Sequence, residues 1–255
     1  MQQELTPGEV VLVGGGPGDP DLLTVAALRA IRQADVVVHD RLGPVSALAE
    51  ARPDAERVNV GKIPRGACTP QEEINAILVD RARQGLRVVR LKGGDSFVFG
   101  RGGEEWQACA EAGVPVRVIP GVTSAVAVPA LAGIPVTHRT LSQGFTVVSG
   151  HVPPGDPRSS VDWAALAASH TTIVLLMGVK YLPEIADALR AGGLSDATPA
   201  AIVADGSTDT QRSWSGTLTS IAAVAADNDV RPPAIVVIGD VAGLGLVSSH
   251  SARPQ

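Results

Sequence analysis

Residues Arg87–Trp106 read RVVRLKGGDSFVFGRGGEEW, an apolar strand that runs into two closely spaced glycine pairs and then a helix. Gly93-Gly94-Asp95 follows the strand directly, and Gly102-Gly103 opens a helix headed by two glutamates. Glycine pairs let the backbone approach a neighbour closely, and the carboxylate between them can accept hydrogen bonds or face a cation. Glycine-rich connections are also common in α/β folds, so this stretch alone leaves both a structural turn and a ligand-binding loop open.

The composition is that of a globular protein whose core is built from Ala, Val, Leu and Ile. The chain has 255 residues, of which 45% are hydrophobic, 18% charged and 3% aromatic, and its length favours two domains. The net charge of −5 argues against nucleic acid as a partner. We see no export signal and no apolar segment long enough to span a bilayer, so we expect a cytoplasmic protein without a membrane partner.

The cysteines and histidines give no sign of a metal centre. The two cysteines, Cys68 and Cys109, have neither metal-ligand nor disulfide-framework spacing, which suits a reducing compartment. The five histidines also lack metal-ligand spacing. We therefore expect no metal.

Apolar strands and helices alternate through the first half of the chain. The expected strands are Val10–Val13, Val36–Val38, Arg57–Val60, Val88–Leu91 and Val114–Ile119. The expected helices are Asp21–Gln33, Glu104–Glu111, and one that starts at Pro70, with Thr69 as N-cap and Glu72 closing a capping box, and ends at Gly85. This alternation predicts a parallel sheet with right-handed crossovers.

Parallel sheets bind ligands outside the carboxyl ends of their strands, and this rule selects candidate site segments. The segments that follow the five strands are Gly14–Asp19, Asp40-Arg41, Gly61-Lys62, Gly93–Asp95 and Gly121–Ser124. They contain acids and bases that are distant in sequence. We therefore expect them to converge on one edge of one sheet.

The second half has more strands than helices. The expected strands are Phe145–Ser149, Thr172–Leu176, Pro199–Ala204, Gln211–Leu218 and Pro233–Ile238, and the expected helix is Lys180–Ala191. The third and fourth strands form a pair across the turn-rich sequence DGSTDT. The surplus of strands predicts a mixed sheet. We thus predict an α/β protein with two domains, residues 1–120 and 121–255.

The sequence matches neither the dinucleotide-binding fingerprint nor the P-loop. Gly14–Asp19 reads GGGPGD, whereas the dinucleotide fingerprint G-x-G-x-x-G requires glycine at the sixth position. Asp19 at that position would repel a pyrophosphate, so the loop suits a neutral or cationic ligand, although a purely structural connection stays open. Gly61-Lys62 lacks the remaining residues of a P-loop. A nicotinamide-dependent oxidoreductase is therefore a poor alternative.

The motifs that surround the strand ends resemble, in order and spacing, those of the tetrapyrrole methylases, and among them of the uroporphyrinogen-III C-methyltransferases. They are VLVGGGPGDPDLLT, VVVHDRL, VNVGK, PQEEIN, VVRLKGGDSFVFGRGGEE, VIPGVTSA, AGIPVTHR and VSGH. The resemblance covers residues 8–245, is strongest in Lys92–Glu105 and is weaker after Pro154.

The resemblance implies a two-domain fold with the active site in the cleft between the domains, and a homodimer. It implies S-adenosylmethionine as methyl donor, S-adenosylhomocysteine as product, and methylation of uroporphyrinogen III at C2 and C7 to give precorrin-2. The donor-binding positions fall on Pro17, Gly93, Gly94, Asp95, Val98, Thr123, Ser124, Met177 and Gly206. The acid–base positions fall on Asp40 and Lys62.

The residues themselves fit this chemistry. A proton must leave the methylated ring system, so a positioned base such as Asp40 helps, and Lys62 could return a proton or hold a carboxylate. A solvated strand end and a surface lysine remain the plain structural alternatives. The substrate carries eight carboxylates, so we expect Arg41, Arg101 and Arg139, together with Lys62, to bind them.

Three positions depart from the family pattern, and two other functions stay open. Ala67 replaces a frequent histidine, Ser96 replaces a proline after Gly-Gly-Asp, and Gly178 replaces a frequent tyrosine; the last two should loosen the donor loop. The first alternative is a methylase of the same fold that acts on a later precorrin. The second is a regulator that binds the donor or a tetrapyrrole without turnover.

Overall fold

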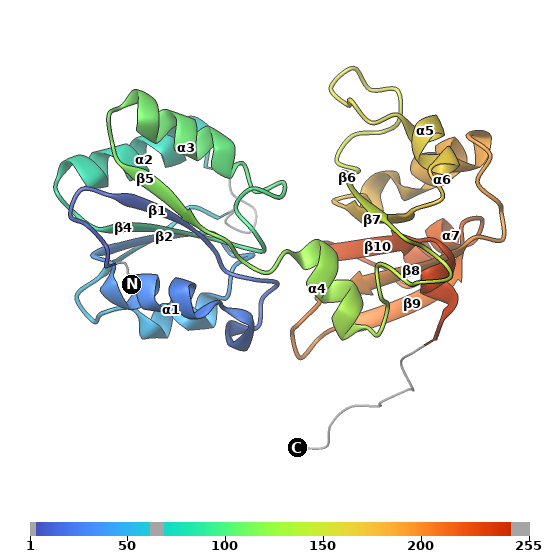
Figure 1. The fold of residues 1–255 in the computed structure, drawn as a ribbon, viewed down its shortest axis with the longest axis horizontal. Coiled ribbons are helices and arrows are strands. Elements are labelled where there is room, and N and C mark those ends of the chain that lie inside the picture. Colours follow the sequence, from blue (N-terminus) through green and yellow to red (C-terminus); the bar gives the residue numbers. More distant parts are fainter. Residues whose placement is uncertain (1–3, 62–68, 246–255) are drawn as a thin grey trace. The chain divides into compact units, whose positions relative to one another are not determined.

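The computed structural model describes residues 4–61 and 69–245, and the chain divides into two compact units, Met1–Ser124 and Ala125–Gln255. Each unit contains one five-stranded sheet (Figure 1). The first sheet is parallel and the second is mixed, which confirms the predicted fold class. The division follows Ser124, four residues after the boundary that we placed at Pro120.

The first unit alternates strands with helices. Its strands are β1 (Val10–Gly14), β2 (Val36–His39), β3 (Glu56–Asn59), β4 (Val88–Lys92) and β5 (Val116–Ile119), in the order β3-β2-β4-β1-β5. Its α-helices are α1 (Val25–Gln33), α2 (Gln71–Arg83) and α3 (Gly102–Glu111), and its 3-10 helices are η1 (Pro20–Leu22) and η2 (Val45–Glu50).

The helices of this unit cover both faces of the sheet (Figure 1). Val11 and Val89 pack with Ile31 of α1, whereas their strand neighbours Val10 and Val88 belong to the cluster that contains residues of α2 and α3. The neighbouring strands β1 and β4 therefore send their connections to opposite faces. In open α/β sheets this switch in direction is where ligands bind.

Two helix starts differ from the prediction. The helix expected from Asp21 begins instead at Val25, because the Thr24 hydroxyl caps it by accepting the N–H of Ala27 at 3.1 Å. The capping box expected at Thr69 is wrong, since Pro70 occupies the N-cap of α2 and no side chain caps that helix.

The second unit contains β6 (Phe145–Ser149), β7 (Thr172–Leu176), β8 (Pro199–Ala204), β9 (Arg212–Thr217) and β10 (Ala234–Ile238), in the order β6-β7-β10-β8-β9. Its helices are α4 (Ser124–Leu131), which begins at the boundary between the units, α5 (Trp163–Ala168), η3 (Val179–Tyr181), α6 (Leu182–Ala191), α7 (Ile221–Asp227) and η4 (Asp240–Gly243). β6 and β7 are parallel and the other neighbours antiparallel. The predicted pairing of β8 with β9 is confirmed.

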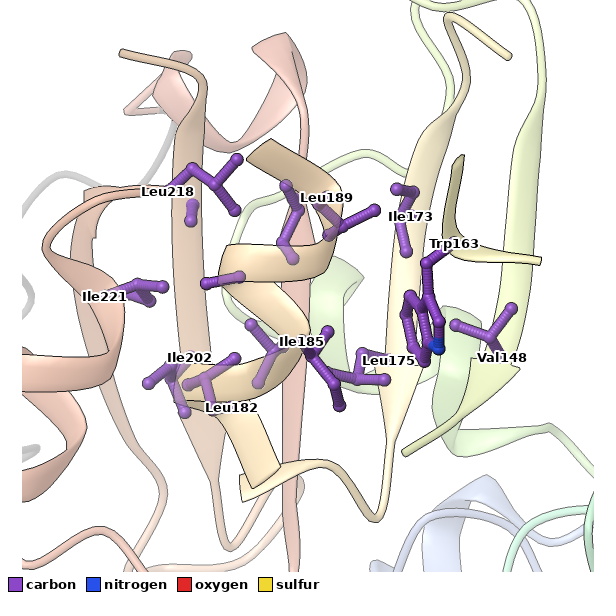
Figure 2. Close-up of a cluster of buried hydrophobic side chains, with 14 of the residues drawn as sticks. Val148, Trp163, Ile173, Leu175, Leu182, Ile185, Leu189, Ile202, Leu218 and Ile221 are labelled. Carbon is purple, nitrogen blue, oxygen red and sulfur yellow. The ribbon is translucent and has the colours of Figure 1, made fainter. Parts of the chain in front are cut away.

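One buried cluster of this unit lies where α6 packs on the sheet (Figure 2), and a second contains Ala125 and Val128 of α4. Leu182, Ile185 and Leu189 of α6 are fully buried, and Trp163 of α5 lies beside Leu175 of β7. The sequence reading missed α4, α5 and α7. No helix in the described parts of the chain has the length and apolar character needed to cross a membrane.

Candidate functional site

The two glycine loops of the first unit are joined at the carboxyl edge of its sheet. Gly15 N–H donates to the Lys92 carbonyl at 2.7 Å, and Gly94 N–H donates to the Gly16 carbonyl at 2.6 Å. The loops that follow β1 and β4 thus lie side by side at the switch in connection direction. The predicted convergence of these segments is confirmed for this pair.

Glycine is required there because backbones are in contact. A Cβ atom on Gly121 would lie 2.3 Å from the Gly94 carbonyl oxygen and 2.5 Å from the Gly14 carbonyl carbon. A Cβ atom on Gly93 would lie 2.6 Å from the carbonyl oxygen of Leu42, in the loop after β2. The loops after β1, β2, β4 and β5 therefore form one closely packed group.

Asp95 ties two of these loops together. Its Oδ1 accepts the N–H of Phe97 at 2.9 Å within its own loop, and its Oδ2 accepts the N–H of Gly121 at 2.9 Å in the loop after β5. A carboxylate can accept further hydrogen bonds at each oxygen. The half-buried Asp95 therefore organises the loops and keeps capacity for a ligand.

Asp40 is held in a fixed orientation at the end of β2. Its Oδ1 accepts the N–H groups of Leu42 at 3.0 Å and Gly43 at 3.3 Å. Its Oδ2 lies 3.2 Å from Nη2 of Arg90, a side chain only 4% exposed. Two amides and one buried guanidinium thus hold the carboxylate in one orientation.

Arg90, which contacts Asp40, belongs to a buried charge cluster that was not predicted from the sequence. Glu105 of α3 is fully buried, and its Oε1 lies 2.8 Å from Nζ of Lys92 and 3.0 Å from Nε of Arg90. Gln71 of α2 also donates to Oε1, at 3.3 Å. Burial lowers the pKa of Lys92, the nearby Arg90 lowers it further, and Glu105 opposes both effects.

The basic residues expected to bind substrate are exposed where the structure describes them. Arg41 follows β2, and Arg101 precedes α3 and pairs with Glu104, with 2.6 Å between Nη2 and Oε2. Arg139 belongs to the second unit, where it lines a hollow of about 360 Å³ with His138. Lys62 lies outside the described residues, as do Ala67 and Cys68.

In the second unit, Met177 follows β7 and Gly206 follows β8. Both strands run antiparallel to β10, which separates them, so both residues lie at the same edge of the sheet. A Cβ atom on Gly206 would lie 2.5 Å from two methyl carbons of Val128 in α4. Gly178 is equally confined, since a Cβ atom there would lie 2.4 Å from a methyl carbon of Leu175.

Left-handed backbone at residues other than glycine marks the same loops. Met177 has a φ of 56° and is 49% exposed, and positive φ angles also occur at Phe99, Arg101, Asp205 and Ser207. Among the described residues, only His170 and Asp229 show this conformation elsewhere. Such strain persists where the surrounding structure enforces it, and it gathers at ligand-binding sites.

The family model described as Tetrapyrrole (Corrin/Porphyrin) Methylases matches residues 9–222. The chain belongs to this family. The match confirms the resemblance seen in the strand-end motifs, and it extends over both units.

Relatives of this tetrapyrrole methylase include siroheme synthase from Pseudomonas putida (strain W619), which is 48% identical over 237 residues. That alignment covers 93% of this chain and 51% of the relative, so the chain spans about half the length of the curated relatives it matches. A solved uroporphyrin-III C-methyl transferase from Thermus thermophilus, complexed with S-adenyl homocysteine, is 42% identical with a TM-score of 0.77, and the match covers 91% of this chain and 98% of that one. A cobalt precorrin-4 methyltransferase is 27% identical with a TM-score of 0.82, covering 92% and 96%.

The joined loops fit a cationic methyl donor. Gly14–Asp19 and Gly93–Asp95 contain two aspartates and no lysine or arginine. Thr123 and Ser124 add half-buried hydroxyl groups beside Gly94. Carboxylate, hydroxyl and backbone groups suit a sulfonium-bearing nucleoside better than a diphosphate.

Proposed function

We propose that this tetrapyrrole methylase transfers two methyl groups from S-adenosylmethionine to uroporphyrinogen III, at C2 and C7, and releases S-adenosylhomocysteine and precorrin-2. The observation that carries the proposal is the carboxyl edge of the first sheet, where the joined glycine loops and the oriented Asp40 lie together. The identity to the Thermus thermophilus enzyme over almost the whole of both chains supports the same reaction.

The donor supplies an electrophilic methyl group on a positively charged sulfur. We assign its binding in the first unit to Pro17, Gly93, Gly94, Asp95, Val98, Thr123 and Ser124. Met177 and Gly206 of the second unit complete the set. The residues chiefly align the two reactants and exclude water, because an in-line displacement depends on alignment.

Asp40 is assigned as the proton acceptor. Methylation of a pyrrole carbon leaves a ring system that must lose a proton, and the fixed Asp40 carboxylate has the geometry of a base. Lys62 is assigned, from the family pattern, to return a proton or to hold a substrate carboxylate. Arg41, Arg101 and Arg139 are assigned to the substrate carboxylates, which they bind through charge-assisted hydrogen bonds.

The arginine assignment has a direct kinetic test. Replacing Arg41 or Arg101 by Ala should raise the KM for uroporphyrinogen III several-fold, because a charge-assisted hydrogen bond is lost. The donor dissociation constant should not change. If both variants keep the wild-type KM, the arginines do not bind substrate.

A later precorrin is the second candidate substrate, because the cobalt precorrin-4 methyltransferase shares the fold with a TM-score of 0.82. The deciding experiment is anaerobic incubation with uroporphyrinogen III and S-adenosylmethionine, followed by mass analysis of the tetrapyrrole. A gain of two methyl groups supports the proposed reaction. Donor binding without methyl gain redirects the search to later precorrins, and failure to methylate those as well leaves a regulator.

We also propose that two copies form a dimer and that the protein works in the cytoplasm. Exposed apolar side chains in the first unit, such as Leu42 and Phe97, are available for a protein contact. The free, buried Cys109 suits a reducing compartment. Sedimentation analysis of the purified protein tests the dimer, and a monomer at micromolar concentration would refute it.

A further inference from the structure

Glu105 of α3 is a buried carboxylate to which the proposed mechanism gives no role. It is 0% exposed, and the three side-chain hydrogen bonds that it makes within the described structure all use Oε1: Lys92 at 2.8 Å, Arg90 at 3.0 Å and Gln71 at 3.3 Å. Its other oxygen, Oε2, is buried and has no hydrogen-bond partner among residues 4–61 and 69–245. The neighbouring Glu104, by contrast, is 53% exposed and pairs with Arg101.

Stability alone does not account for Glu105. Burying a charged oxygen without a partner is unfavourable, and well-packed apolar residues often match or exceed the stability of buried ion pairs. A buried polar group left unsatisfied calls for another explanation, and function is one of them. The cluster also lies directly behind Asp40, at the same edge of the sheet.

The guanidinium of Arg90 connects Glu105 to Asp40. Its Nε contacts Glu105 at 3.0 Å, and its Nη2 contacts Asp40 at 3.2 Å. Its Nη1 donates to the Leu91 carbonyl at 3.0 Å and the Val38 carbonyl at 3.4 Å. All three guanidinium nitrogens make hydrogen bonds, so the planar group has one orientation. The contact with Glu105 fixes Nε, the nitrogen nearest to the aliphatic part of the side chain.

We propose that Glu105 is a positioning residue that holds Arg90 against Asp40 and thereby fixes the proton acceptor of methyl transfer. The inference rests on the proposed function. Glu105 also offsets the charge of Lys92, so its loss would leave the buried Arg90 and Lys92 without the carboxylate that contacts both of them. The guanidinium of Arg90 would then lose the contact that fixes its Nε, and the Asp40 carboxylate bound to it would shift out of alignment with the substrate.

The test compares Glu105→Gln with Glu111→Gln in the full-length protein. Glu111 lies on the same helix, but it is exposed and contacts only Gln107 in the described structure. We expect Glu105→Gln to lower kcat about 100-fold, because misplaced catalytic groups lose rates of this order. The donor Kd, measured by calorimetry, should stay within about twofold, since acid–base alignment and donor binding are separate functions. Glu111→Gln should match wild type in both.

A second arm separates positioning from a general structural effect. In an Asp40→Asn background, Glu105→Gln should cause little further loss of the methyl-transfer rate, because residues that act through one another are non-additive. If the effects of the two substitutions multiply, Glu105 does not act through Asp40. Should Glu105→Gln fail to fold, Lys92→Met combined with Glu105→Gln removes one buried charge of each sign and still releases Arg90.

The outcomes distinguish the two proposals. A wild-type protein that binds the donor and methylates no tetrapyrrole refutes the proposed function and the inference together. An active wild type with a fully active, folded Glu105→Gln variant refutes the inference alone. A parallel loss of donor affinity and kcat would also overturn it, because Glu105 would then support the donor loop rather than Asp40.

Discussion

In the first unit, the carboxyl ends of all five strands lie at one edge of the sheet, whereas the corresponding edge of the second unit holds three strand ends and two strand starts. β6, β7 and β8 end at that edge, and β9 and β10 begin there. In a parallel sheet, the loops that follow all strands lie at the same edge. In a mixed sheet, the strand directions decide which of these loops share an edge. The loops at the edge of the first sheet can therefore be predicted from the order of strands and helices in the sequence, whereas those of the second sheet cannot.

The largest effect is expected for Asp40→Asn, at the carboxyl edge of the first sheet. Asparagine keeps the shape and an acceptor for the amides of Leu42 and Gly43, but it cannot take a proton. We expect kcat to fall about 10²–10⁴-fold, the usual contribution of a general base. The donor Kd and the free energy of unfolding should stay close to wild type. A variant that keeps a third of the wild-type rate would show that the base lies elsewhere.

A substitution in the core of the second unit tests whether its packing affects the free energy of unfolding without affecting the proposed reaction. Leu189→Ala removes a fully buried side chain of α6 (Figure 2) and should lower the free energy of unfolding by about 2–5 kcal/mol, through lost burial and the cavity left behind. The kcat of the folded protein should be unchanged. Leu131→Ala is the matched control, since that leucine is 47% exposed and should change stability by less than about 0.5 kcal/mol. Equal effects in urea unfolding would contradict the assignment of the core.

Gly121→Ala tests the gathering of loops in the first unit. The added Cβ would lie 2.3 Å from the Gly94 carbonyl oxygen, so the loops after β4 and β5 must separate. We expect a loss of about 1–3 kcal/mol in stability, as for other overpacked sites, together with weaker donor binding. Gly103→Ala is the control, because its Cβ would meet no atom within 4 Å and alanine favours the helix by about 0.5–1 kcal/mol. If the two variants bind the donor equally well, the loop contact is irrelevant to binding.

The strands and the loops at the carboxyl edge of the first sheet could be predicted because the patterns that mark them are local in the sequence. Apolar runs predicted most of the strands, β9 was predicted as the partner of β8 across a turn-rich sequence, and the alternation with helices implied which ends share an edge. The helices α5 and α7, WAALAA and IAAVAAD, are too short and too rich in alanine to show a periodic polar face. α4 contains Pro129, and a proline in the interior of a segment argues against a helix there.

The buried charge cluster could not be predicted, because its members meet only in the folded sheet. Arg90 and Lys92 alternate with apolar residues of β4, which by itself also describes a strand with one solvated face. Only the sheet order, with β4 between β2 and β1, shows that α2 and α3 bury that face. Gln71 and Glu105 are 34 residues apart. No local pattern links them.

The smallest predicted effect concerns the opposite edge of the first sheet, where Asp35 precedes β2. Hydrogen bonds from Arg87, at 2.8 Å from Nε and 2.7 Å from Nη2, lower the pKa of Asp35 from 3.8 to about 2, against the opposing effect of burial. A lowered folded-state pKa means that the carboxylate stabilises the fold above pH 3.8 and that this contribution disappears as the pH falls toward 2. Because Asp35 is partly exposed, we expect Asp35→Asn to lose about 1–2 kcal/mol at pH 7.

Urea unfolding of wild type and Asp35→Asn at several pH values measures this contribution. The difference between the two proteins should shrink steadily below pH 4 and be lost as the pH falls through 2, while the methyl-transfer rate at pH 7 is the same for both. A difference that does not depend on pH would mean that the ion pair with Arg87 is not its source. A loss of activity in Asp35→Asn would show that the amino edge of the parallel sheet, and not only its carboxyl edge, takes part in the chemistry.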